Sequence, residues 1–162
     1  MKKTDVAIMS QLRVDGRLPL TVLSKRTRLP VSTTHVRLKR MVEKGLVRPT
    51  LLLNFQKVGF QVRAFILLAI ESKEKERLYV EVQCHPNVNS AFRINNGWSV
   101  LMDCVFKDMF ALEDFVDMLE STFTVKQKQV HYVLDELKTE SFFNDPVVAV
   151  RLMNEVAGAN FK

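Results

Sequence analysis

The sequence predicts an α+β protein with two modules, an N-terminal group of short helices and a C-terminal βαββαβ sandwich. Apolar residues recur at helical spacing over the first third of the chain and change to strand-like alternation from residue 61. Charge divides at nearly the same place: residues 1–63 carry 14 Lys and Arg against 3 Asp and Glu, a net +11, whereas residues 64–162 carry 10 against 15, a net −5. This asymmetry indicates a basic module with a polyanionic partner and an acidic module with a different task.

Three helices are expected in the N-terminal module. The first covers residues 5–14 and ends at Asp15-Gly16, and the second covers residues 19–28 with a basic end. The third begins near Pro30 and runs to Lys44, before a glycine suited to a left-handed cap. Apolar and small residues share the inner faces of these helices: Ile8, Met9, Leu12, Leu20, Leu23, Val31, Thr34, Leu38, Met41 and Val42.

The opposite face of the third helix combines small polar residues with basic ones. It holds Ser32, Thr33, Val36 and Arg40, and Arg37 and Lys39 flank it. Small hydroxyl side chains near the helix start leave room for close approach, and the basic side chains reach outward. Three short helices, of which the last is small, polar and basic on its exposed face, are typical of a helix-turn-helix. The plainer alternative is an exposed basic face that binds nothing.

The segment after the third helix predicts a wing. Residues 46–60 contain two short extended runs around a turn, with Pro49 marking an edge or a bend.

The C-terminal module shows the order βαββαβ. Strands are expected over residues 61–70, 88–95, 99–106 and 127–134, and helices over residues 74–84 and from Asp108. The middle strands are joined at Asn95-Asn96-Gly97, a hairpin signal. This order predicts a ferredoxin-like sandwich. A further helix starts after Asp145 with a stripe of Val148, Leu152 and Val156, and we hypothesise that it supports oligomer contacts.

Few residues suggest catalytic or metal chemistry. Cys84 and Cys104 are far apart with no partner at metal-ligand spacing, and we expect both to be buried free thiols. The three histidines are equally scattered. The longest apolar run, residues 64–70, is far shorter than the ~20 residues that cross a bilayer. We therefore expect no metal, no cofactor and no membrane association, and a cytoplasmic location.

At this point the residues resemble the Lrp/AsnC (leucine-responsive, feast/famine) family of transcription regulators. The resemblance rests on "DGRLPLTVLSKRTRLPVSTTHVRLKRMVEKGLV", "LNFQKVGFQVRAFILLAI", "ALEDFVDML" and "VHYVLDELK". It implies a winged helix-turn-helix joined by a strand to an ACT/RAM-like effector-binding domain that forms dimers and often tetramers or octamers. The expected divisions are residues 1–50 for DNA binding, 51–62 for the linker strand and wing, 63–140 for the effector and oligomerisation domain, and 141–162 for a helical extension.

Three positions depart from the family pattern. Arg28 stands where a glycine is usual, and Pro30 stands where a capping serine is usual, so we expect Ser32 or Thr33 to help satisfy the helix start. Family members that bind amino acids carry a Gly-x-aromatic-Asp pattern between two strands. The candidate effector residues here are Asn96, Gly97, Trp98 and Ser99, of which Trp98 fits the aromatic place and Ser99 lacks the carboxylate. An alternative is a tight hairpin whose tryptophan packs into a subunit interface.

The leading hypothesis is a sequence-specific regulator that binds double-stranded DNA as a homodimer or larger oligomer and responds to an unknown small molecule. The candidate DNA-binding residues are Ser32, Thr33, Val36, Arg37, Arg40, Lys39, Lys25, Arg26, Arg28 and Arg48. One alternative is an architectural protein that wraps DNA with little sequence preference. Another is an enzyme, because siroheme decarboxylases resemble the same family, although residues 89–103 contain Arg93 and no histidine.

Overall fold

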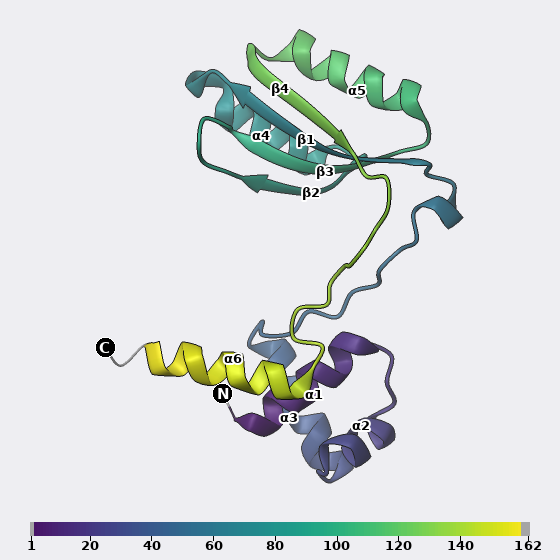
Figure 1. Ribbon diagram of the computed structural model, residues 1–162, viewed down its shortest axis with the longest axis vertical. Helices are drawn as coiled ribbons and strands as arrows, with labels where there is room; N and C mark the ends of the chain where they lie inside the picture. Colours follow the sequence, from purple (N-terminus) through teal and green to yellow (C-terminus); the bar gives the residue numbers. More distant parts are fainter. Residues whose placement is uncertain (1, 160–162) are drawn as a thin grey trace. The chain divides into compact units, whose positions relative to one another are not determined.

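The computed structural model describes residues 2–159, and these form two compact units. The helical unit contains residues 2–52 together with residues 137–159, and the sheet unit contains residues 53–136. The chain therefore leaves the helical unit once and returns to it (Figure 1). Each unit is described by itself below.

The helical unit begins with the three expected helices, α1 (Lys3–Val14), α2 (Leu20–Thr27) and α3 (Val31–Glu43). Ile8, Leu23 and Met41 supply one buried side chain from each helix and form the centre of a small core. This confirms the inner faces inferred from helical spacing. At the two ends of α3, Val31 and Val42 remain largely exposed, because the core is too small to cover the whole length of the helix.

The turns after α2 and α3 use left-handed backbone. Gly45 has a φ of +67°, and the N–H groups of Gly45 and Leu46 donate to carbonyls of the last turn of α3, which ends the helix as its glycine predicts. Arg28, directly after α2, also lies in the left-handed region, with φ 54° and ψ 40°. The position where the family usually has glycine therefore keeps the glycine-like conformation with a larger residue.

The expected wing strands do not form. Residues 46–61, all of which the structure describes, contain no strand, and their regular structure is limited to the 3₁₀ turn η1 (Gln56–Val58). A strand needs a neighbour for its N–H and C=O groups, and an isolated hairpin is only marginally stable. Pro49 also lacks an N–H for pairing. The apolar residues 51–53 therefore suggested a strand, whereas in the structure they are exposed and belong to no strand.

The sheet unit confirms the ferredoxin-like βαββαβ order. Its elements are β1 (Val62–Ile70), η2 (Ser72–Glu74), α4 (Lys75–Cys84), β2 (Val88–Arg93), β3 (Val100–Phe106), α5 (Met109–Thr122) and β4 (Val125–Tyr132). The sheet order is β2-β3-β1-β4, and every neighbouring pair is antiparallel. Asp108 caps α5 by accepting the N–H of Ala111 at 2.9 Å, as expected.

The core of this unit lies between one sheet face and the two helices. Alternate residues of β1 (Ala64, Ile66, Leu68) and of β3 pack against apolar residues of α4 and α5. Cys104 lies in this core, and burial raises the pKa of its thiol to about 12. Cys84, at the end of α4, is exposed, so the expectation of two buried thiols was wrong for that residue.

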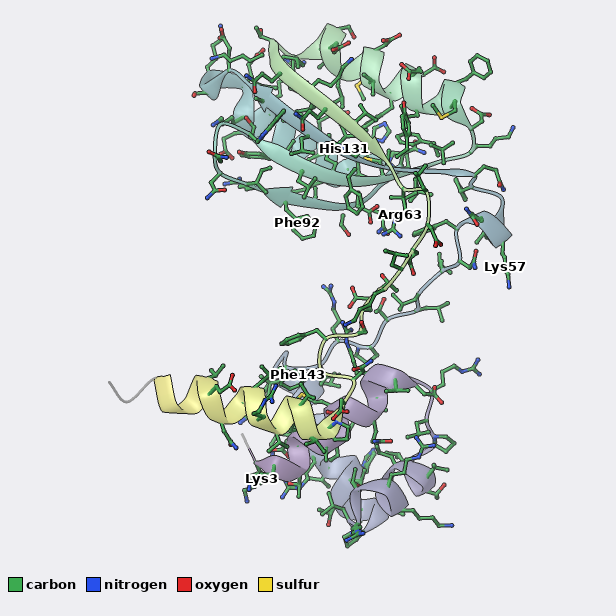
Figure 2. The ribbon with its side chains drawn as sticks, in the orientation of Figure 1. Lys3, Lys57, Arg63, Phe92, His131 and Phe143 are labelled. Carbon is green, nitrogen blue, oxygen red and sulfur yellow. The ribbon has the colours of Figure 1, made fainter. Side chains whose placement is uncertain are left out.

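The other sheet face carries a partly buried ion pair on neighbouring strands. Arg63 on β1, labelled in Figure 2, donates to both carboxylate oxygens of Asp103 on β3. Each of these distances is 2.8 Å, and a third contact of 2.9 Å reaches Glu136. Asn89 on β2 donates to the same aspartate at 2.7 Å. Asp103 is only 4% exposed, so these bonds compensate for its removal from water. The ion pair links β1, β3 and the segment after β4.

The last helix, α6 (Pro146–Ala159), belongs to the helical unit and packs on α1. Asp145 caps it by accepting the N–H groups of Val147 and Val148 at 2.7 and 3.0 Å. The stripe expected from the sequence is only partly correct, because Val148 and Val156 are exposed, whereas Ala149 is fully buried. None of the helices within residues 2–159 is long and apolar enough to span a bilayer.

Candidate nucleic-acid interface

All ten residues predicted to bind DNA lie in the helical unit. Six are on α3, two are in the last turn of α2, one is in the turn between these helices, and one follows α3; in chain order they are Lys25, Arg26, Arg28, Ser32, Thr33, Val36, Arg37, Lys39, Arg40 and Arg48. The fold therefore brings residues from a 24-residue stretch onto one small helical body.

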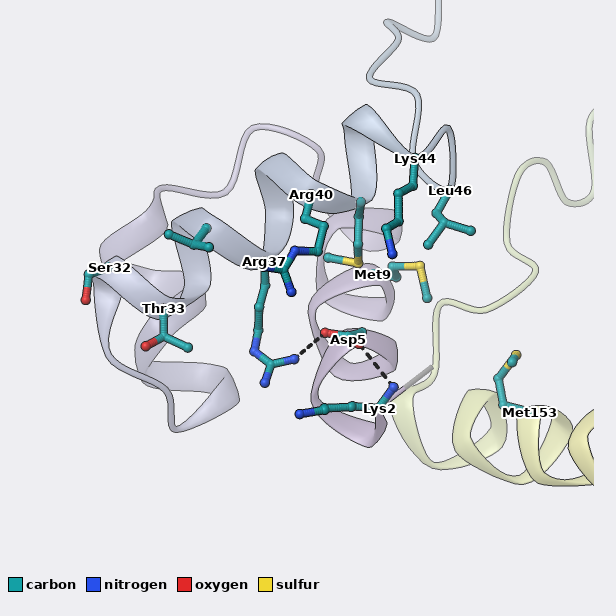
Figure 3. Close-up of a pocket in the computed structure, with 12 residues that line it drawn as sticks. Lys2, Asp5, Met9, Ser32, Thr33, Arg37, Arg40, Lys44, Leu46 and Met153 are labelled. Carbon is teal, nitrogen blue, oxygen red and sulfur yellow. Dashed lines mark hydrogen bonds and ion pairs between the residues drawn. The ribbon is translucent and has the colours of Figure 1, made fainter.

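Five of these residues line a groove of about 1090 Å³ beside α3 (Figure 3). They are Ser32, Thr33, Val36, Arg37 and Arg40. The rest of the lining comes from α1 and the residue before it, from the buried side of α3 and the turn after it, and from one residue of α6: Lys2, Asp5, Met9, Met41, Lys44, Leu46 and Met153. The groove thus has an apolar floor with sulfur-containing side chains and several cationic groups at its edges.

Arg37 does not extend freely from α3. Its guanidinium contacts the Asp5 carboxylate of α1 at 2.6 Å, and the other carboxylate oxygen accepts the N–H of Lys2 at 3.0 Å (Figure 3). Burial by itself would raise the pKa of Asp5, but the Lys2 N–H and the Arg37 guanidinium outweigh burial and hold that pKa below its ordinary value. The pair therefore fixes α3 to α1 and holds the Arg37 side chain at the edge of the groove.

Other cationic side chains are less restrained. Lys39 lies 3.9 Å from Glu43 across one helical turn, and Arg26 donates to Gln11 at 3.0 Å. No carboxylate among the described residues pairs with Lys25, Arg28, Arg40 or Arg48. Exposed cations without an internal counter-ion are the groups best able to donate hydrogen bonds to phosphate oxygens or base acceptors.

Lys2 and Lys44 were missed by the reading of the sequence. Lys44 follows Arg40 by four residues, so continuing the helical period by one turn identifies it. Lys2 reaches the same groove only because α1 packs beside α3, which no local pattern indicates. Met153 comes from the far end of the chain and depends on the return of α6 to this unit.

The start of α3 differs from the expectation. Pro30 precedes the helix with extended backbone (ψ 145°), and no side chain caps the first turn, so the predicted help from Ser32 or Thr33 was wrong. The Thr34 hydroxyl instead donates back to the Pro30 carbonyl at 3.0 Å. Because the first N–H groups of a helix have no intrahelical acceptor, those of α3 remain available to an anion or to water.

The candidate effector residues form the tip of the hairpin between β2 and β3. Asn96 and Gly97 have φ values of 59° and 89°, the left-handed pair that a tight hairpin requires. Both are exposed, and Trp98 is half-buried. Asn96, Gly97 and Trp98 therefore lie together at one accessible turn.

Ser99 lies apart from that exposed tip. It is 2% exposed, its hydroxyl accepts the N–H of Ile70 at 3.2 Å, and its own N–H donates to Leu68 at 2.8 Å. The side chain thus extends the pairing of β1 with β3. Ser99, which stands where the family pattern has an aspartate, is therefore hydrogen-bonded to β1 of the sheet.

Two family models match the chain. Residues 1–48 match a winged helix-turn-helix DNA-binding domain, and residues 63–141 match the Lrp/AsnC ligand-binding domain. Helix α6 lies beyond both matches.

The chain is also similar over most of its length to known transcriptional regulators. The chain is 28% identical over 140 residues to the transcriptional regulator FL11 of Pyrococcus furiosus, covering 82% of this chain and 93% of FL11. It is 30% identical over 118 residues to YezC of Bacillus subtilis, an uncharacterized regulator, covering 72% and 84% of the two chains. A transcriptional regulator of Neisseria meningitidis, solved with L-Met, superposes with a TM-score of 0.80 at 34% identity, covering 86% of this chain and 93% of that one. With the helix-turn-helix and the four-stranded sheet, these matches show that the chain belongs to the Lrp/AsnC family of effector-responsive, DNA-binding transcriptional regulators.

Proposed function

We propose that this regulator reads a specific DNA sequence with the exposed face of α3. The observation that carries the proposal is the position of Arg40, an exposed cation at the edge of the groove with no carboxylate partner among the described residues. Arg40 can donate two hydrogen bonds to guanine O6 and N7 in the major groove. Ser32 and Thr33 are short enough to approach base edges or phosphate, and Val36, which is exposed, fits a thymine methyl group.

The remaining cations fix the protein on the duplex. Lys25, Arg26, Arg28 and Arg48 lie outside α3 or at its flank and contact phosphate oxygens, which carry no sequence information. Arg37 differs from the cations without a carboxylate partner, because it contacts the DNA while its guanidinium stays paired with Asp5.

The active species in this proposal is a homodimer or a larger oligomer such as a tetramer or octamer. Two copies of α3 would then read a pseudo-palindrome whose half-sites lie ~10 bp apart or a multiple of that distance. The regulator works in the cytoplasm and is not an enzyme, in keeping with relatives that are named as transcriptional regulators. Light scattering of the full chain measures the subunit number directly.

The hairpin tip of the sheet unit takes part in effector binding. The support is the ligand-binding family match and the relative from Neisseria meningitidis that was solved with L-Met. We expect a small molecule to bind beside Asn96, Gly97 and Trp98. Isothermal titration with L-Met and other amino acids tests this, with Trp98→Ala as the variant that loses binding and Phe110→Ala, exposed elsewhere in the unit, as the control.

Selection and sequencing of genomic fragments by the purified full chain, at two salt concentrations, tests DNA reading. We expect an enriched pseudo-palindrome with steep salt dependence. Arg40→Ala should reduce the binding preference for the correct base pair at one position of the site by about 1–3 kcal/mol. Lys25→Ala, the matched control, should weaken all sequences alike. Salt-sensitive retention without a motif would favour the architectural role, and no retention at either salt concentration would refute DNA binding.

A further inference from the structure

We propose that α6 is a displaceable cover on the DNA-binding groove, so that DNA binds more tightly once α6 leaves α1. The proposal rests on the proposed function of α3. It concerns a helix that lies beyond both family matches.

The groove and α6 share a boundary. Met153 of α6 lines the same groove as Arg40 and as the other α3 residues proposed to read DNA (Figure 3). α6 packs on α1 and its Ala149 is fully buried, whereas Val156, two turns further along the same face, is 58% exposed. The second half of α6 therefore extends beyond its support on α1.

The face of α1 under α6 is separate from the three-helix core. Val6 and Ser10 are buried and lie about half a helical turn away from Ile8, which faces that core. Removing α6 therefore exposes only a second, small apolar face and leaves the core of α1, α2 and α3 in place. This arrangement allows α6 to leave without unfolding the helix-turn-helix.

The attachment of α6 is narrow. Ala149 is its single fully buried residue among those whose side chains the structure describes. The preceding segment is held by Arg13 of α1, which donates to the Phe142 carbonyl at 3.1 Å and pairs with the Glu140 carboxylate. Both of these side chains are exposed enough for water to compete with the ion pair.

Charge opposes a direct role for α6 in holding DNA. Its 14 residues contain one cation, Arg151, and one anion, Glu155, which lie 3.8 Å apart. Its contribution to the groove is the thioether of Met153, which offers phosphate no hydrogen-bond donor. The phosphate backbone of a duplex in the groove would gain contacts from Lys2 and Lys44. Where the phosphates lie against α6, however, they would lose bound water without gaining a hydrogen bond. Lys2 and Lys44 are both exposed with α6 in place, so withdrawal of α6 does not uncover them but removes the obstacle that keeps a phosphate backbone from lying against both.

The test compares two full-length variants that carry the same new side chain. Ala149→Gln places a longer polar residue in the fully buried contact and should release α6, whereas Val147→Gln changes a residue that is 79% exposed on the same helix. Fluorescence anisotropy with the duplex of highest affinity from the genomic selection should show about tenfold tighter binding for Ala149→Gln at low salt. The slope of log affinity against log salt should steepen by about two, one step for each lysine. Val147→Gln should match the wild type.

The other affinities that a folded Ala149→Gln variant could show overturn the proposal. Unchanged affinity in Ala149→Gln, with hydrogen exchange showing that α6 is released, would mean that α6 does not obstruct DNA, and weaker binding would make α6 part of the DNA contact. If Ala149→Gln does not fold, Ala149→Val enlarges the same buried contact by less, and a smaller gain in the same direction is expected. A wild-type protein that binds no duplex would instead refute DNA binding itself. A change in mass by light scattering, without a change in affinity, would favour the oligomer role.

Discussion

Replacing Arg28 with glycine should stabilise the helical unit and weaken DNA binding in the same protein. Arg28 ends α2 with φ 54° and ψ 40°, a conformation in which the β-carbon approaches the following carbonyl at a cost of about 1–2 kcal/mol. Glycine avoids that cost but loses about 0.5–1 kcal/mol through the greater freedom of the unfolded chain. The expected net gain in the free energy of unfolding is therefore about 0.5–1 kcal/mol.

The loss of DNA affinity has a separate cause. If Arg28 contacts one phosphate, its removal releases about one counter-ion fewer, and the slope of log affinity against log salt falls by about 0.9. Arg28→Ala is the matched control, because it removes the same charge and keeps a β-carbon in the left-handed conformation. The two variants should lose the same DNA affinity, whereas Arg28→Gly alone should gain stability.

Thermal unfolding followed by circular dichroism at 222 nm measures the stability, and anisotropy at several salt concentrations measures the affinity. A domain of this size shifts its melting temperature by about 4–8 °C for each kcal/mol, so a gain of about 0.5–1 kcal/mol is well resolved. Equal stability of Arg28→Gly and Arg28→Ala would refute the assignment of backbone strain to this turn. An unchanged salt slope in both would remove Arg28 from the phosphate contacts.

Three further predictions concern ionisable groups. Asp5→Asn should lower the free energy of unfolding at neutral pH and make it depend less on acid pH. The pKa of Asp5 in the folded state lies below its ordinary value of 3.8, so the ionised carboxylate stabilises the fold above pH 3.8, and this stabilisation is lost as the pH falls through the folded-state pKa. Unfolding measured across an acid pH series tests this. Asp103→Asn should cost about 2–3 kcal/mol in urea unfolding, since it leaves a partly buried guanidinium with one carboxylate, whereas Glu136→Gln at an exposed site should cost under about 1 kcal/mol. A thiol reagent at pH 8 should label Cys84 quickly and should reach Cys104, whose pKa is raised to about 12, only on unfolding, with mass spectrometry identifying the labelled site; equal labelling of both would contradict the core position of Cys104.

Local patterns predicted most of the elements because each is specified by its own residues. The spacing of Ile8 and Leu23, the glycine at 45 and the cap at Asp108 predicted helices that the structure contains. Alternation predicted the four strands, and their order predicted the sheet. In each case the evidence lies within one helical turn or one strand, so no distant contact was needed.

The failures arise where a distant contact decides the outcome. The extended runs of residues 46–60 look like strands, but no partner strand meets them within the described chain. Arg37 lies on the outer face of α3 by helical spacing, and only the packing of α1 brings Asp5 to it. Ser99 was grouped with an exposed loop, whereas the neighbouring β1 draws it into the sheet. The stripe on α6 was displaced by one residue, because Ala149 is small and gives no strong apolar signal.

The return of the chain to the helical unit changes how this protein can be divided. A fragment ending near residue 52, the usual way to isolate an N-terminal DNA-binding domain, would lack α6 and would expose the buried face of α1 at Val6 and Ser10. Topologically the sheet unit is an insertion between two parts of the helical unit. A faithful minimal helical unit therefore needs residues 2–52 joined by a short flexible linker to residues 137–159, and a protease that cuts only one connection leaves the two units covalently joined through the other.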